Sequence, residues 1–255
     1  MIGEIFTTII YQPFYNLFVF FVGVFPGENV GLAVVALTLA VKFAILPFTH
    51  KSMKTSATMK IVQPEIDKIK ERHKNDQKEQ AAHIMNLYKK HGINPFSSCL
   101  FSFVQIPIII GLYWVFWKGF AGGIIHTDIL YSFVSPPESV NLSFLGFFDL
   151  GTRSIFLSLL AGVTQFLQMH LAFPKSKKDE RKELGEKSFS EEMKKSFAFQ
   201  ARYVLPIVIV VASLGFSAAV PLYWSTSNLF SVVHELLVRR KAARLVSAGD
   251  ILHAT

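Results

Sequence analysis

Lys42 is the residue whose position most needs a chemical explanation. It lies in the apolar stretch from Val30 to Pro47, which contains no other formal charge. A bilayer core of about 30 Å is crossed by about 20 apolar helical residues, so this stretch predicts a transmembrane helix. A lysine inside such a helix costs about 2.5–3.5 kcal/mol on insertion scales. Thr38 lies four residues earlier on the same helix face, which makes the two side chains a candidate polar site.

Polar side chains also occur in the other apolar stretches of the chain. Lipid offers them no hydrogen bonds, so we expect them to face the interior of a helix bundle or a wet cavity. Two simpler explanations stay open. Lys42 could extend its ammonium group to the membrane surface, and the other side chains could make interhelical hydrogen bonds worth only about 0.6 kcal/mol each. The residues concerned are Gln105, Thr164, Gln165, Gln168, Ser213, Ser217, Ser225, Ser227 and Asn228.

Other kinds of site receive little support from the sequence. His73, His83 and His91 lack the spacing of a metal site. No Gly-x-x-x-x-Gly-Lys sequence, which would bind nucleotide phosphates, occurs in the chain. The single cysteine, Cys99, excludes an intramolecular disulfide and any multi-cysteine metal site. We therefore expect a protein that uses no cofactor and no metal and that is not an enzyme.

The composition predicts an all-α, polytopic membrane helical bundle. Hydrophobic residues make up 51% of the 255 residues, and the charged residues gather in separate segments. Over residues 1–27 we predict an interfacial helix, because Gln12, Pro13 and Asn16 disfavour a lipid-facing span. A full first span is the alternative. The turn Pro26-Gly27 would end this helix. Five transmembrane helices follow, over residues 29–48, 96–117, 151–173, 203–219 and 221–238.

A charged segment separates the first two of these five spans. Residues 50–95 hold ten Lys/Arg and five Asp/Glu and no apolar run. Apolar residues recur there at three- and four-residue steps, first on one helix and then on a second that Gly92 would stop. The pattern predicts a cytoplasmic helical hairpin over residues 51–92 with its apolar stripes packed together. These residues are Met59, Val62, Ile66 and Ile69 on the first helix and Ile84, Leu87 and Tyr88 on the second.

The distribution of basic residues predicts the topology. Residues 50–95, a second charged loop at 174–202 and a basic tail at 239–255 hold 23 of the 26 Lys/Arg. With five spans, all three segments fall on the same side of the membrane, which the positive-inside rule makes the cytoplasm. The N-terminus then faces out, the C-terminus is cytoplasmic, and the loop at 118–150 faces out.

Taken in order, these features resemble the YidC membrane-protein insertase family over nearly the whole chain. The resemblance is to its compact five-span form, without a large extracytoplasmic domain, and it divides the chain into the interfacial helix at 1–27 and an insertase core at 28–255. It implies a multi-pass protein of the bacterial plasma (inner) membrane. The motifs are Lys42 followed by Leu46-Pro47, VQPEI at Val62–Ile66, LYKKHGINP at Leu87–Pro95, QIPI at Gln105–Ile108, Gly162-Val163-Thr164 and LYWSTSNL at Leu222–Leu229.

The resemblance implies an insertase and chaperone that moves transmembrane segments of nascent proteins from the cytoplasm into the lipid bilayer without nucleotide hydrolysis. In the family, a hydrophilic groove holds one positive charge that attracts acidic residues of the substrate. The ribosome and the general secretion channel are further partners that the resemblance suggests. The groove positions of the family map onto Lys42, Thr38, Gln105, Thr164, Gln168, Trp224, Ser227 and Asn228.

Lys42 departs from the family, which typically has arginine at this position. Lysine loses its proton more readily when it is buried, and it makes no bidentate pair with a carboxylate. The alternative function is a small-solute membrane transporter or channel that uses the same polar cavity. The scarcity of acidic residues in the spans and the one-sided charged hairpin argue against this alternative.

Overall fold

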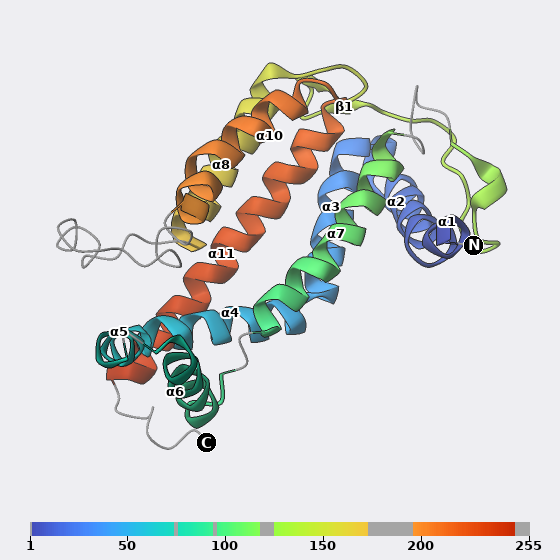
Figure 1. Ribbon diagram of the computed structural model, residues 1–255. Helices are drawn as coiled ribbons and strands as arrows, with labels where there is room; N and C mark the ends of the chain where they lie inside the picture. The colour runs from blue at the N-terminus through green and yellow to red at the C-terminus, as the bar shows by residue number, and fades with distance from the viewer. Residues whose placement is uncertain (1, 74–75, 94–95, 118–124, 173–195, 248–255) are drawn as a thin grey trace. The chain divides into compact units, whose positions relative to one another are not determined.

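The computed structural model describes residues 2–73, 76–93, 96–117, 125–172 and 196–247, without the side chains of 2, 52–54, 56–57, 60–61, 96–105 and 241–247. The described elements are helices and one short pair of strands (Figure 1). They form two compact units. The first unit comprises Met1–Phe43 and Ile108–Val233, and the second comprises Ala44–Pro107 and His234–Thr255.

The first unit begins with a nearly continuous apolar helix. It consists of α1 (Ile2–Phe6), the π-helical turn η1 (Thr7–Tyr11) and α2 (Gln12–Val24). The predicted turn after it is present, because the short 3₁₀ helix η2 (Pro26–Glu28) contains Gly27 at φ +67°, a conformation that favours glycine. The stretch Gly3–Val24 is long and apolar enough to cross a membrane, so its length does not distinguish a surface helix from a span.

The helix that carries Lys42 ends earlier than the sequence predicted. α3 (Val30–Ala44) stops before Ile45, whereas the predicted span ran to residue 48. A new helix, α4 (Leu46–Ile61), starts at once with Pro47 in its first turn, where the missing N–H of proline costs nothing. Leu46-Pro47 therefore divides two helices instead of leading into a loop. At its other end, α3 is capped by Asn29, whose Oδ1 accepts a hydrogen bond from Leu32 N at 3.0 Å.

Two helices of the first unit pack closely against each other. α8 (Ile155–Ala172) lies beside α10 (Leu205–Ser213), as Figure 1 shows. Gly162 permits this approach, because a Cβ there would overlap Val210 Cγ2 and come within 3.3 Å of Pro206 O. Helical residues run from Ser196 to Ser213, including the π-helical turn η5 (Gln200–Val204), so this helix begins and ends before the predicted span at 203–219.

The last helix is longer than the predicted span at 221–238. α11 runs from Ala219 to Ser247, so the first nine residues of the predicted basic tail continue the helix. α7 (Phe96–Trp117) matches the predicted span at 96–117 and contains Pro107. The residues Asn94-Pro95, whose types would suit an N-cap and a first helical position, lie outside the described residues. By length and composition, the described helices include three that could cross a membrane, Gly3–Val24, Ile155–Ala172 and Ser196–Ser213, and two shorter apolar ones, Val30–Ala44 and Ile106–Trp117.

The loop between α7 and α8 is tied to the N-terminal part of the first unit. It contains a 3₁₀ turn, η4 (Thr127–Ile129), and two strands, β1 (Ser143–Phe144) and β2 (Phe148–Asp149), which pair antiparallel with Phe144 opposite Phe148. Phe144 covers Gly31 so closely that no Cβ would fit there. Asn16 accepts a hydrogen bond from Tyr131 N at 2.6 Å and donates one to Ile129 O at 3.0 Å.

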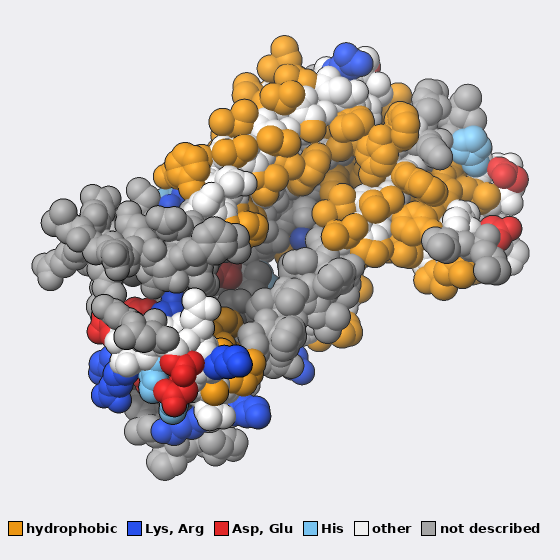
Figure 2. All heavy atoms as spheres, in the orientation of Figure 1, with side chains coloured by type: hydrophobic (Ala, Val, Ile, Leu, Met, Phe, Trp, Pro, Cys, Tyr) orange, Lys and Arg blue, Asp and Glu red, His pale blue; other side chains and the backbone are white. Residues whose placement is uncertain are grey.

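The second unit contains the predicted hairpin. α5 (Gln63–Arg72) and α6 (Gln77–Lys90) pack against each other. Asp76 caps α6 by accepting hydrogen bonds from Lys78 N and Glu79 N at 2.9 Å. Gly92 follows α6 at φ +60°, as the predicted stop. Charged side chains cover the hairpin (Figure 2), and its core contains the predicted stripes: Val62, Ile66, Leu87 and Ile93 are buried, with Met59, Ile69, Ile84 and Tyr88 around them.

Candidate functional site

Lys42 is buried in the first unit and touches a hydroxyl of α11. The residue is 8% exposed, and its Nζ donates a hydrogen bond to Ser231 Oγ at 3.4 Å. Ser231 Oγ in turn donates to Ser227 O at 2.9 Å. Among the described residues, no carboxylate lies within ion-pair distance of this ammonium group. Glu235, which follows Ser231 by four residues on α11, accepts instead from Arg239 Nε at 2.8 Å.

Thr38 occupies the same buried face of α3 as Lys42. It is 1% exposed, and its hydroxyl donates to Val34 O, one turn earlier, at 2.6 Å. This bond satisfies the hydroxyl within its own helix, so Thr38 can stay in apolar surroundings without a partner on another helix. The hydroxyl oxygen keeps a lone pair that can accept a hydrogen bond from an entering group.

A second polar contact joins α11 to α8. Asn228 is 3% exposed, and its Nδ2 donates to Thr164 Oγ1 at 3.3 Å and to Ala161 O at 3.4 Å. Thr164 Oγ1 also donates to Leu160 O at 2.9 Å. The structure thus brings together two residues that the sequence placed in different spans. No hydrogen bond among the described residues connects this pair to Lys42 and Ser231.

The other predicted groove residues have different surroundings. Ser227 is buried and supplies its carbonyl to Ser231. Trp224 is half-buried and lines a small apolar cavity between α7 and α11. Gln168 is half-buried on α8 and makes no hydrogen bond within the described residues. The side chain of Gln105 lies outside the description, so its predicted place in the groove stays a prediction.

Sequence reasoning missed Ser231, the hydrogen-bond partner of Lys42. Ser231 lies four residues after Ser227 and therefore on the same face of α11, so the i, i+4 spacing was the available signal. The predicted span at 221–238 contains several serines, which made this signal weak. Arg202 was also missed as an interior residue. It is 5% exposed, although it was counted as the last basic residue of a charged loop.

The surface of the first unit is apolar where α8 and α10 are exposed. Ile155, Phe156 and Leu159 on α8 are each more than half exposed, as are Ile207 and Val211 on α10. Figure 2 shows hydrophobic side chains covering both helices. An exposed apolar surface on helices that are long and apolar enough to cross a membrane fits lipid as its surroundings. Buried polar groups and an exposed apolar surface together define a polytopic membrane protein.

Comparison with known proteins identifies the family. Residues 20–244 match the model of the family described as 60Kd inner membrane protein, and the chain belongs to this family. It is 31% identical over 217 residues to the membrane protein insertase YidC of Clostridium tetani, and the aligned residues cover 84% of each chain.

Two further relatives carry names of the same kind. The chain is 30% identical over 245 residues to the membrane protein insertase YidC 2 of Bacillus anthracis, covering 93% of this chain and 82% of the relative. It is 31% identical over 238 residues to the membrane protein insertase MisCB of Bacillus subtilis, covering 89% and 78%. The family predicted from the motifs is confirmed.

Proposed function

We propose that this chain is a membrane protein insertase and chaperone that moves transmembrane segments of nascent proteins from the cytoplasm into the bilayer. The names of its relatives support the activity. The observation that carries the mechanism is Lys42, which is buried and bonded only to a neutral hydroxyl among the described residues. A substrate carboxylate that replaced Ser231 would turn a long neutral contact into a charge-assisted hydrogen bond, which is shorter and about twice as strong.

The proposed groove is a passive catalyst of transfer. Moving an apolar segment into lipid is downhill, by about 0.3–0.6 kcal/mol for each good apolar residue at the centre of a span. The barrier is the polar flank, which must leave water before it reaches the other side. A path lined by Lys42, Thr38, Gln105, Thr164, Gln168, Trp224, Ser227 and Asn228 would lower that barrier without nucleotide hydrolysis. The exposed apolar residues of α8 would border the route into lipid.

The proposed topology has five spans and an N-terminal interfacial helix, with the N-terminus outside and the C-terminus in the cytoplasm. Contacts of the N-terminal helix support the surface position. Phe6, Tyr11 and Phe18 lie on Trp114 and Phe116 near the end of α7. These contacts span thirteen residues of the N-terminal helix but only residues 114–116 of α7, as expected for a steep crossing. Tyr15 and Asn16, in the middle of the N-terminal helix, also accept hydrogen bonds from the loop at 118–150, which this topology places outside.

The proposed partners follow from the same arrangement. Nascent membrane proteins are the substrates, and the cytoplasmic hairpin at 51–92 receives them. The basic residues of the second loop and the tail, 174–202 and 239–255, would contact the ribosome, whose RNA attracts positive charge. The general secretion channel is the remaining proposed partner.

Complementation of bacterial cells depleted of their own insertase tests the proposal. The full chain is compared with Lys42→Arg and Lys42→Met at matched expression. We expect growth with the parent and with Lys42→Arg, which keeps the charge, and a failure or strong delay with Lys42→Met, which keeps the length. Growth with all three chains would support the insertase activity but would show that the charge of Lys42 is not required for it.

Reconstituted insertion separates the activity from host effects. Proteoliposomes containing the parent chain receive a substrate whose translocated flank carries Asp, or the same substrate with Asn in place of Asp. Insertion of the Asp substrate should fall in Lys42→Met, whereas insertion of the Asn substrate should change little. Solute leakage without insertion of either substrate would contradict an insertase and favour a transporter or channel.

A further inference from the structure

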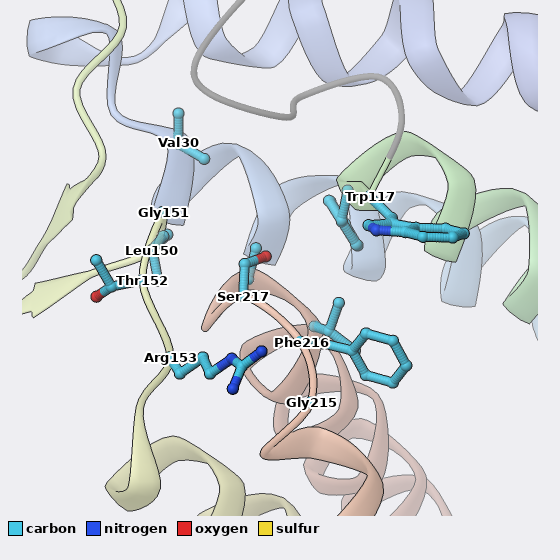
Figure 3. A pocket seen from close by; sticks show the side chains of 12 residues that line it. Val30, Trp117, Leu150, Gly151, Thr152, Arg153, Gly215, Phe216 and Ser217 are labelled. Atoms are coloured by element: carbon cyan, nitrogen blue, oxygen red, sulfur yellow. The ribbon is translucent and has the colours of Figure 1, made fainter.

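A cavity of about 390 Å³ lies in the first unit where several helices begin or end. It is lined by Trp117 at the end of α7, by the segment Leu150–Arg153 before α8 and by the turn Gly215–Ser217 between α10 and α11 (Figure 3). A hydrogen bond from Ala218 N to Thr152 O at 2.8 Å fixes the two segments to each other. The segment before α8 and the start of α11 are thus joined by a backbone contact next to the cavity.

Among the described residues that line this cavity, Arg153 is the only basic one. Its side chain extends from the segment before α8 toward the Gly215–Ser217 turn (Figure 3). Among the described residues, no carboxylate lies within ion-pair distance of its guanidinium group. Asp149, the closest acid along the chain, accepts a hydrogen bond from Gly151 N at 2.9 Å. The guanidinium is thus available to an anion, and its planar fork matches phosphate oxygens.

An adjoining cavity of about 160 Å³ is apolar. It shares Phe116, Phe216 and Val220 with the first cavity, and it continues between α7 and α11. A compartment with a cationic group therefore adjoins an apolar compartment across these shared residues. The remaining residues that line the apolar compartment are Ile109, Ile110, Tyr113, Tyr223 and Trp224.

We propose that the two cavities form a binding site for one anionic phospholipid, with the phosphate on Arg153 and an acyl chain along the apolar compartment. The pairing of one cation with a hydrocarbon wall is complementary to an amphiphile. Free phosphate or a nucleotide would leave the apolar compartment unfilled. Trp117, which is 55% exposed at the end of α7, is placed as aromatic residues are at a membrane interface. The inference goes beyond the proposed insertion activity and requires only that the chain lies in a membrane.

The tryptophans of the chain provide the test. The variant Trp114→Phe/Trp117→Phe retains Trp224, which lines the apolar compartment, as its single tryptophan. It is reconstituted in phosphatidylcholine vesicles with increasing fractions of phosphatidylglycerol brominated on its acyl chains. A bound brominated chain quenches Trp224. We expect half of the quenching at a mole fraction about fivefold lower than with brominated phosphatidylcholine, as expected for one partly exposed charge pair.

Arg153→Gln, in the same single-tryptophan background, should abolish the preference for phosphatidylglycerol, and Arg153→Lys should retain most of it. Arg240→Gln removes an exposed arginine from α11 outside both cavities and should leave the quenching curve unchanged. If Arg153→Gln fails to fold, Arg153→Lys in high salt gives the same comparison, because screening weakens the charge pair at an exposed site.

Three results would overturn the proposal. Equal curves for the parent and Arg153→Gln would mean that Trp224 senses ordinary surrounding lipid. Displacement of the lipid by millimolar inorganic phosphate would assign the cavity to a soluble anion. Protection of Trp224 by an acidic transmembrane peptide at a lower mole fraction than the lipid would assign it to a translocating segment. Lipid-selective quenching that resists both competitors and requires Arg153 would establish the site.

Discussion

The first unit and the α5–α6 hairpin solve opposite packing problems. In the first unit, Lys42 and Asn228 are buried while Ile155 on α8 is 70% exposed. In the hairpin, Ile66 and Leu87 are buried while the surface carries the charges (Figure 2). Each region exposes the groups that suit its surroundings. The first unit exposes apolar groups, as suits lipid, and the hairpin exposes charged groups, as suits water. The comparison implies that shape and small residues hold the first unit together, whereas apolar burial holds the hairpin.

Gly162→Leu should produce the largest loss of stability, because it disrupts the close packing of two helices in the first unit. The added side chain would overlap Val210 Cγ2 and press on Pro206 O, so α8 and α10 would have to separate. Extra methylenes in a packed core already cost about 1–3 kcal/mol, and leucine adds a whole branched side chain next to a backbone oxygen, so we expect a larger cost here. We expect little folded protein by size-exclusion chromatography in detergent. Gly23→Leu, at a glycine with open space around it, should behave as the parent.

Val210→Ala sharpens the same test. It removes the atom nearest to the added Cβ, so Gly162→Ala should be tolerated better in the Val210→Ala background than in the parent. A coupling of about 1 kcal/mol or more between the two sites is expected for residues in contact. Additive thermal shifts would contradict the close packing of α8 on α10.

Ile66→Ala should have the next largest effect, and it should be confined to the hairpin. Ile66 is 3% exposed in the hairpin core, and truncating a buried isoleucine costs about 2–5 kcal/mol. Hydrogen exchange should accelerate in α5 and α6. Met85→Ala, on the same hairpin at a residue that is 42% exposed, is the matched control. Similar acceleration in both variants would mean that the hairpin has no apolar core of its own.

Asn228→Leu should have a small effect on stability. Its hydrogen bonds to Thr164 and Ala161 are 3.3–3.4 Å long, and Thr164 retains bonds within its own helix. Interhelical hydrogen bonds in membranes average about 0.6 kcal/mol. A cycle with Thr164→Val, read by thermal unfolding, should give a coupling near that value. A coupling above about 2 kcal/mol would make polar contacts, and not shape, the main cohesion of the first unit.

Acidification should produce the smallest loss of stability, because it affects one exposed set of hydrogen bonds, between Glu28 and the loop at Glu138 and Ser139. The hydroxyl of Ser139 and the N–H groups of Glu138 and Ser139 bond to the Glu28 carboxylate and hold its pKa below the usual range. The stabilisation is complete above the unfolded pKa of about 4.3, and it disappears as the pH falls through the lower folded pKa.

Amide exchange at Glu138 and Ser139, corrected for intrinsic rates, measures this loss. Protection should decrease only below about pH 4 in the parent. It should be low and independent of pH in Glu28→Gln. Asp128→Asn keeps the Glu28 contacts and should follow the parent. An unchanged pH profile in Glu28→Gln would mean that other contacts hold the loop.

The sequence predicted the fold best where apolar residues recur with one helical period. The stripes around Ile66 and Leu87 could be recognised because water enforces a polar face on the hairpin. Helix ends were harder. Pro47 was interpreted as the end of a span. Proline is also common in the first turn of a helix, and Pro47 lies in the first turn of α4. The helical start of the basic tail was missed because a charge run carries no periodic signal.

The candidate site was only partly predictable for a similar reason. Lys42 carries a charge and Asn228 an amide, and because such groups are costly in an apolar helix, their presence alone made them candidates. Their partners are not rare. Ser231 is one of several serines in the last span, and only the packing of α3 on α11 selects it. Glu235, the acid on α11 one turn beyond Ser231, pairs locally with Arg239 at i, i+4 and does not contact Lys42.

The bonds between α2 and the α7–α8 loop have a consequence for the timing of synthesis. Asn16 bonds to Ile129 across 113 residues, and Glu28 bonds to Ser139 across 111. Translation proceeds at about 5–20 residues per second, so the N-terminal helix waits about 6–23 s until these partners are synthesised. During that interval the Asn16 amide lacks its contacts in the loop. A nascent chain arrested before Ile129 should therefore hold this helix less firmly than one arrested after Asn141.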